Sequence, residues 1–256
     1  MRVVVTHPAT RLPALAAVLC IACLFSVVLM GMGGDIALAD ALYRLQGGQW
    51  ALRDAWLMST VVHVWGRDMS AACWLAVAAA WGMTWRGAVS RKWRRPLAYL
   101  LVTALLSTVL VSALKQYTGV DCPWDLQRYG GERIALGLFE ARPLAMGRAA
   151  CFPAGHASAG YGWVAVYFAL SAVRPRWRFW GLGAALTAGA VFGFGQQLRG
   201  AHFLSHDLWT LTLSWLGAAM SARLWLTRAT PARASVSRAS RSLRPARIGT
   251  TPRATS

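Results

Sequence analysis

The chain has 256 residues, of which 56% are hydrophobic and 14% are charged, and 14 are Trp. A soluble domain carries about 25% charged residues, so this composition excludes an ordinary soluble domain and indicates an integral membrane protein. The formal net charge of +18 is typical of nucleic-acid-binding proteins. In a membrane protein, however, basic residues gather in cytoplasmic loops, and we expect no nucleic-acid partner.

Six apolar stretches follow one another along the chain, each close to the roughly 20 residues with which a helix crosses a bilayer. They cover residues 15–32, 69–85, 97–114, 157–173, 179–195 and 208–226. Arg2 and Arg11 precede the first stretch as in a signal peptide, but it lacks a small-residue cleavage site, so we expect it to be retained. The sequence predicts an all-α integral membrane domain, residues 1–226, with six transmembrane helices.

The charged residues predict the orientation of these helices. All nine acidic residues fall in the segments after the first, third and fifth stretches, whereas the alternate segments carry only Lys and Arg. The positive-inside rule then places both termini in the cytoplasm and the acidic segments on the outer face. Residues 227–256 are rich in Ser, Thr, Pro, Ala and Arg, and this predicts a basic, disordered cytoplasmic tail.

Two segments form the predicted outer face. Residues 34–67 predict two short interfacial helices separated by Gly47 and Gly48, with His63 in the second. A lone histidine there is more typical of packing or helix capping than of catalysis. Residues 115–153 contain frequent Gly and Pro, which predicts a long irregular loop, and such loops are usually functional.

Three polar groups lie where apolar stretches begin or end on this face. They are residues 115–123 after the third stretch, 153–156 before the fourth, and 200–206 between the fifth and sixth. His202 and His206 are four residues apart and would share one face of a helix. One histidine could act as a nucleophile and another as a general acid.

Cations accompany these histidines. Lys115, Arg199 and Arg148 lie close to them in the sequence, and Gly155 lets the backbone approach a ligand closely. Cations and free amides attract an anion, and phosphate fits that chemistry. These residue types therefore predict phosphoryl transfer, with a phosphohistidine that divides the reaction into two steps.

The three groups, in this order, resemble the motifs of the type 2 phosphatidic acid phosphatase superfamily over residues 97–226. Those motifs are Lys-x6-Arg-Pro, Pro-Ser-Gly-His and Ser-Arg-x5-His-x3-Asp. The resemblance implies that Lys115 binds phosphate, His202 is the nucleophile and His156 is the acid that protonates the leaving oxygen. It also implies a six-span helical core as in bacterial members, and so a bacterial inner membrane, with no metal or other cofactor. The charge distribution places the active site on the periplasmic face, and because a headgroup can reach a site at the membrane surface, we expect a phosphorylated membrane lipid as substrate.

The chain departs from these motifs at four positions. Cys122 and Gln196 replace the two arginines, Ala154 replaces the serine, and His206 replaces the aspartate, with Asp207 one residue later. We expect Arg199 and the loop arginines to replace the missing cations; the loop arginines are Arg128, Arg133 and Arg148. We expect His206 to accept the ring proton of His202, and Asp207 to polarise that pair or to cap the next helix.

Cys122 and Cys151 are the two cysteines of the outer face, and the other three lie within apolar stretches. An oxidising periplasm would permit a disulfide between them, which would join the loop after Lys115 to the loop before His156. We predict this disulfide.

Three other interpretations stay open. His156, His202 and His206 could form a three-histidine zinc site, although the neighbouring cations would repel a divalent metal. The chain could be a lipid-binding or transport relative without catalysis. It could also transfer the phosphoryl group to a second lipid rather than to water.

Overall fold

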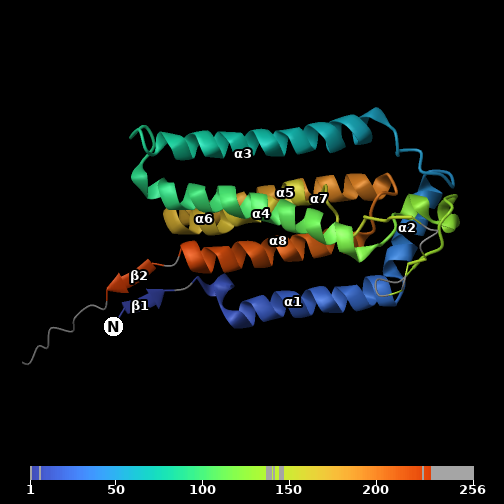
Figure 1. Ribbon diagram of the computed structural model, residues 1–256, viewed down its shortest axis with the longest axis horizontal. Helices are drawn as coiled ribbons and strands as arrows, with labels where there is room; N and C mark the ends of the chain where they lie inside the picture. The colour runs from blue at the N-terminus through green and yellow to red at the C-terminus, as the bar shows by residue number, and fades with distance from the viewer. Residues whose placement is uncertain are drawn as a thin grey trace, which may run out of the picture. The chain divides into compact units, whose positions relative to one another are not determined.

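The computed structural model describes residues 2–5, 7–136, 140, 142–143, 147–226 and 228–231. The chain divides into a helical unit, Thr6–Thr227, and a second unit that joins Met1–Val5 with Arg228–Ser256. Figure 1 shows the long helices of the first unit running alongside one another.

The helical unit contains eight α-helices within its described residues. They are α1 (Leu12–Ser26), α2 (Gly34–Leu45), α3 (Gly66–Met83), α4 (Arg94–Thr118), α5 (Ser158–Tyr161), α6 (Ala165–Val173), α7 (Arg178–Leu198) and α8 (Leu204–Trp225). Two π-helical segments, Val27–Gly31 and Leu57–Trp65, follow α1 and precede α3. Short 3-10 turns occupy Pro8–Thr10, Arg91–Trp93, Pro123–Asp125, Gln127–Tyr129, Gly162–Val164 and Pro175–Trp177.

Each of the six predicted spans coincides with a helix or, for residues 157–173, with the consecutive α5 and α6. Two helical runs, Leu12–Gly31 and Arg91–Asp125, are long and apolar enough to cross a membrane by length and composition. The shorter run Ser158–Val173 is also apolar. The helical class is therefore confirmed, and the membrane crossing of all six helices is taken up below as a proposal.

The core lies where α4, α6, α7 and α8 meet. Tyr99 is fully buried, and its hydroxyl donates a hydrogen bond to the carbonyl of Ala218 at 2.8 Å. Gly160 and Gly189 allow α5 and α7 to touch, because a Cβ on Gly160 would lie 2.3 Å from the backbone nitrogen of Gly189. Small residues at helix contacts are typical of membrane proteins.

The segment predicted as a second interfacial helix is instead continuous with α3. Leu57–Trp65 runs directly into Gly66, where the helix continues. Gly66 has helical backbone angles, φ −60° and ψ −44°, so the helix does not end there. Phe192 packs so closely that a Cβ on Gly66 would lie 2.5 Å from its ring. The first predicted interfacial helix corresponds to α2.

The second unit contains a short antiparallel pair, β1 (Arg2–Val5) and β2 (Arg228–Pro231). Arg2 is opposite Pro231, and Val5 is opposite Arg228. β2 lies inside the segment 227–256 that the sequence predicts to be disordered. Its four residues gain order from backbone pairing, which requires no apolar side chains, and the other residues of that tail lie outside the described ones.

Candidate functional site

The first two polar groups meet at Lys115 and Gly155. Lys115 lies in the last turn of α4, which ends at Gly119 with a φ of 62°. A Cβ added to Gly155 would lie 3.1 Å from Nζ of Lys115 and 3.4 Å from its Cδ. The absence of a side chain at position 155 therefore leaves the space that the ammonium group occupies.

The second group is anchored to the first turns of α8. The N–H of Ala154 donates to the carbonyl of His206 at 3.2 Å, and the hydroxyl of Thr210 donates to the carbonyl of Ala154 at 3.0 Å. The hydroxyl of Thr118, near the end of α4, donates to the carbonyl of Phe152. These contacts bring the three polar groups together at one end of the helical unit.

His156 is held on two sides by the segment before α3. Its Nε2 lies 3.1 Å from the carbonyl oxygen of Val62, an arrangement that requires the proton on Nε2. Its ring stacks on that of His63, with centroids 4.3 Å apart and planes 28° apart. Burial, with a smaller contribution from the charges of His63, Arg199 and Arg67, lowers the pKa of His156 to about 4. His156 is therefore neutral at neutral pH in the free protein.

His202 and His206 do not share a helical face, and that expectation is wrong. α8 begins at Leu204, and Phe203 before it is extended, so His202 precedes the helix. The two rings meet edge-on with centroids 5.8 Å apart. Neither Nδ1 atom has a hydrogen-bond partner among the described residues, so the expected proton-sharing bond is not formed.

His202 is buried and uncharged. Burial lowers its pKa well below the usual value, and the charges of His206, Lys115 and His156 add to the effect. A neutral imidazole retains the lone pair that a nucleophile needs.

Two aspartates near the start of α8 have partners that the sequence does not reveal. Asp35, in the first turn of α2, accepts the backbone N–H of Ser205 at 3.0 Å and so caps α8 from another helix. Asp207 accepts a hydrogen bond from Nε2 of Gln197 at 2.5 Å. The carboxylate of Asp207 faces α7, where a Cβ added to Gly193 would lie 2.7 Å from its Cγ. Asp207 therefore neither polarises the histidines nor caps the helix.

Of the predicted replacement cations, Arg199 reaches the site. Its NH1 donates to Oε1 of Gln196 at 3.2 Å, and its Nε donates to the carbonyl of Arg53 at 2.7 Å. Burial lowers the pKa of both His63 and His156, and the charge of Arg199 adds to the effect. Gln196, at the position of a motif arginine, also lies 3.1 Å from Nδ1 of His63.

The arginines of the outer loop have other partners. Arg128 forms two hydrogen bonds to Asp40 of α2, at 2.7 and 2.6 Å, which lower the pKa of that carboxyl to about 2. Arg133 pairs with Asp121 at 2.6 Å, and Arg148 donates to the side chain of Gln116. Arg128 and Arg133 thus fasten the outer loop, and none of these contacts places the three arginines beside the histidines.

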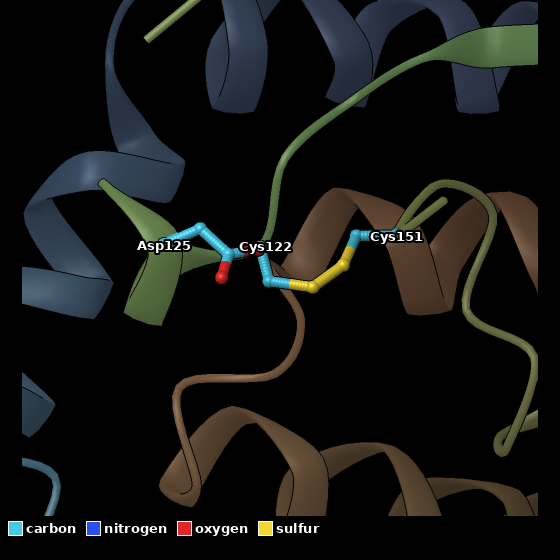
Figure 2. A group of neighbouring side chains, drawn as sticks. All are labelled: Cys122, Asp125 and Cys151. Atoms are coloured by element: carbon cyan, nitrogen blue, oxygen red, sulfur yellow. A yellow bond between two sulfur atoms is a disulfide. The ribbon is translucent and has the colours of Figure 1, made fainter. Parts of the chain in front are cut away.

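Figure 2 shows the disulfide that joins Cys122 and Cys151. Their Cα atoms are 5.3 Å apart. The backbone N–H of Cys151 also donates to the carbonyl of Val120 at 3.0 Å. Together these contacts join the loop after α4 to the segment before His156. The residue that replaces the motif arginine therefore has a structural partner.

Cys122, Cys151 and Asp125 form the one group of potential metal ligands found among the described residues, with ligand atoms within 4.8 Å of one another (Figure 2). Metals bind cysteine as the thiolate, and sulfurs that are bonded to each other do not offer it. His156, His202 and His206 do not form such a group.

The structure adds His63 and Gln196 to the predicted site. Sequence reasoning assigns His63 to packing, since one histidine in an apolar segment carries little signal. Gln196 was identified only as a departure from a motif. Their proximity depends on the contact between α7 and the segment Leu57–Trp65, which spacing along the chain does not show.

The helical unit gathers a lysine and three histidines from separate segments at one end, an arrangement suited to handling an anion. The sequence model of the PAP2 superfamily matches residues 96–229, more than half of the chain, and the chain belongs to this superfamily. Comparison with curated proteins gave no match, and comparison with solved structures gave none. Activity of this superfamily is of the phosphatase or phosphotransferase type.

Proposed function

We propose that the protein is a membrane lipid phosphatase. It hydrolyses a phosphate monoester or diphosphate of a lipid at the periplasmic face of a bacterial inner membrane. The observation that carries the proposal is the convergence of Lys115, His156 and His202, which occupy motif positions of the superfamily, at one end of the helical unit.

Exposed apolar side chains support the six-span membrane arrangement. Leu24 of α1, Leu75 of α3, Trp180 of α7 and Leu224 of α8 are each more than 60% exposed. Such side chains on several helices suit hydrocarbon as the surrounding medium. The segregation of all nine acidic residues to alternate segments supports cytoplasmic termini and a periplasmic site.

In the first step, a ring nitrogen of neutral His202 attacks the phosphorus atom, and the bond from phosphorus to the lipid oxygen breaks. His156 donates a proton to the leaving oxygen. Burial keeps His156 neutral in the free protein, and the negative charge of the bound phosphate favours its protonated form. The cations Lys115 and Arg199 stabilise the charge on the phosphoryl oxygens in the transition state.

In the second step, neutral His156 takes a proton from water. The water oxygen bonds to phosphorus, the bond to nitrogen breaks, and inorganic phosphate leaves with His202 restored. The edge-on packing of His206 against His202 orients the nucleophilic ring by contact. A second lipid hydroxyl in place of water would give phosphotransfer with the same residues.

The test is phosphate release by the purified full-length protein over a panel of lipids. The panel contains undecaprenyl diphosphate, phosphatidylglycerophosphate, phosphatidic acid and lipid A phosphates. We expect His156→Ala and His202→Ala to lower release at least a hundredfold. The matched control is His7→Ala, because the ring of His7 packs against Tyr167 and Phe168 of α6, away from the site.

A substrate labelled in the phosphoryl group separates the two reactions. Label recovered as free phosphate supports hydrolysis, and label recovered in a second lipid establishes phosphotransfer instead. If neither product forms from any lipid of the panel, the proposed function is refuted.

A further inference from the structure

We propose that His63 is a positioning residue of the active site, which holds the ring of His156 by stacking and is itself held by Gln196. The inference rests on the proposed function, in which His156 is the general acid. It adds to that function a residue outside the three motifs and gives a role to the glutamine that replaces a motif arginine.

The π-helical segment Leu57–Trp65 supplies two consecutive contacts to His156. The carbonyl of Val62 lies 3.1 Å from Nε2, and the ring of His63 stacks at 4.3 Å between centroids. On another side of the His156 ring lies the ring of Phe192 of α7, and the centroids of these two rings are 5.3 Å apart. The carbonyl selects one tautomer of His156, and the two rings restrict its plane. π-Helical turns are rare and occur frequently at functional sites.

His63 is fixed by a chain of hydrogen bonds from α7. The amide nitrogen of Gln196 lies 3.1 Å from Nδ1 of His63, and the amide oxygen accepts NH1 of Arg199 at 3.2 Å. Nε of Arg199 donates a second hydrogen bond, to the carbonyl of Arg53 at 2.7 Å. Gln196 is buried, so these bonds form in a region where an unpaired amide would be costly. Position 196 therefore supports His63.

Positive groups from three helices face the stacked pair. They are Arg199 just after α7, Arg67 of α3 and Lys115 of α4. Burial lowers the pKa of His63, and these three charges add to the effect. Two stacked imidazoles among three cations resist protonation until an anion arrives. The stack thus holds the general acid in place while the site is empty and leaves its protonation to the phosphate of the substrate.

A general acid that is displaced by about 1 Å loses on the order of a hundredfold in rate. We therefore expect His63→Ala to lower kcat about a hundredfold while KM changes less than about twofold, because the contacts of His63 are with His156 and Gln196 and not with a cation assigned to phosphate. His63→Phe keeps a flat ring and is expected to retain kcat within about tenfold of the wild type. His7→Ala is the matched control, and thermal unfolding of each variant shows whether it is folded.

Gln196→Ala provides a second, independent test. It is expected to lower kcat in the wild-type background and to have a smaller effect when combined with His63→Ala, where only its contact with Arg199 is left to lose. Equal effects of Gln196→Ala in both backgrounds would overturn the proposal. An unchanged kcat in folded His63→Ala, or a folded His63→Phe as impaired as His63→Ala, would also overturn it.

Nitrogen-15 spectra of labelled histidines separate this proposal from the proposed function. We expect the wild type to show His156 protonated on Nε2, bonded to the carbonyl of Val62. In His63→Ala the ring loses its stacking partner and can turn away from that carbonyl, so we expect a mixture of tautomers. An inactive wild type would refute the lipid phosphatase and leave this readout intact. A His156 signal that His63→Ala does not change would refute the role of His63.

Discussion

Gly155→Ala tests the contact that joins the first two motifs. A Cβ at this position would lie 3.1 Å from Nζ of Lys115 and 3.4 Å from its Cδ. The 3.1 Å separation is tighter than nine in ten real Cβ contacts, so the flexible end of the lysine must move by a few tenths of an ångström. The substitution therefore acts on the position of one positive charge and leaves the backbone undisturbed.

The expected loss of kcat/KM follows from the contribution of a charged hydrogen bond between Lys115 and the phosphate. A hydrogen bond to a charged group contributes about 1.5–3 kcal/mol, and each 1.4 kcal/mol corresponds to a tenfold change in rate. Displacing the ammonium group from the phosphate should lower kcat/KM roughly tenfold to a hundredfold. The free energy of unfolding should change by less than about 1 kcal/mol, because a flexible side chain absorbs the contact.

The assay is steady-state phosphate release from the lipid that the panel identifies. Gly183→Ala is the matched control, since a Cβ there meets no atom within 4 Å, and its activity should equal that of the wild type. In a Lys115→Ala background, Gly155→Ala should have no additional effect. A full loss in that background, or an unchanged kcat/KM in the single variant, would refute the role assigned to Gly155.

Three further predictions concern stability. Asp35→Ala removes the hydrogen bond that caps α8 at the backbone N–H of Ser205, and it should lower the free energy of unfolding by about 1–2 kcal/mol. The control, Asp68→Ala at an exposed ion pair, should change the free energy of unfolding by less than about 0.5 kcal/mol. Equal shifts of the melting temperature in the two variants would contradict this prediction. The pKa of His156 is lowered from 6.5 to about 4, so between these pH values the unfolded chain binds more protons than the folded one. The free energy of unfolding should therefore fall as pH falls through that range. His156→Gln should weaken this pH dependence, and an unchanged pH dependence would argue against a buried neutral ring. Reduction of the disulfide, whose cysteines are 29 residues apart, should lower the free energy of unfolding by about 3.5 kcal/mol through the entropy of the unfolded loop, and it should lower activity. A melting temperature unaffected by reductant would show that the loop is held without the disulfide.

Much of the site could be predicted because its residues lie in recognisable local patterns. Lys115, His156 and His202 each border an apolar stretch, and the three groups keep the order and approximate spacing of a known family. The disulfide partners were identifiable because only two cysteines, Cys122 and Cys151, fall on the predicted outer face.

The partners of polar side chains could not be predicted in the same way. Arg128 is a suitable phosphate ligand by charge, but Asp40, 88 residues away in the chain, holds it. His202 and His206 have helical spacing, but the helix begins between them, at Leu204. A charge or a spacing defines which contacts are available, and the distances among all competing partners decide which one forms.

The sequence by itself determined the helical class, the positions of the apolar segments and the residues that carry the chemistry, because hydrophobic runs and motif spacing are properties of neighbouring residues. Only the tertiary structure decided that His63 and Gln196 belong to the site and that Asp35 caps α8. It also decided that Arg199, rather than Arg128, lies beside the histidines. Those choices depend on how α2, α7 and the segment Leu57–Trp65 pack around the start of α8, and packing is set by contacts between residues far apart in the chain.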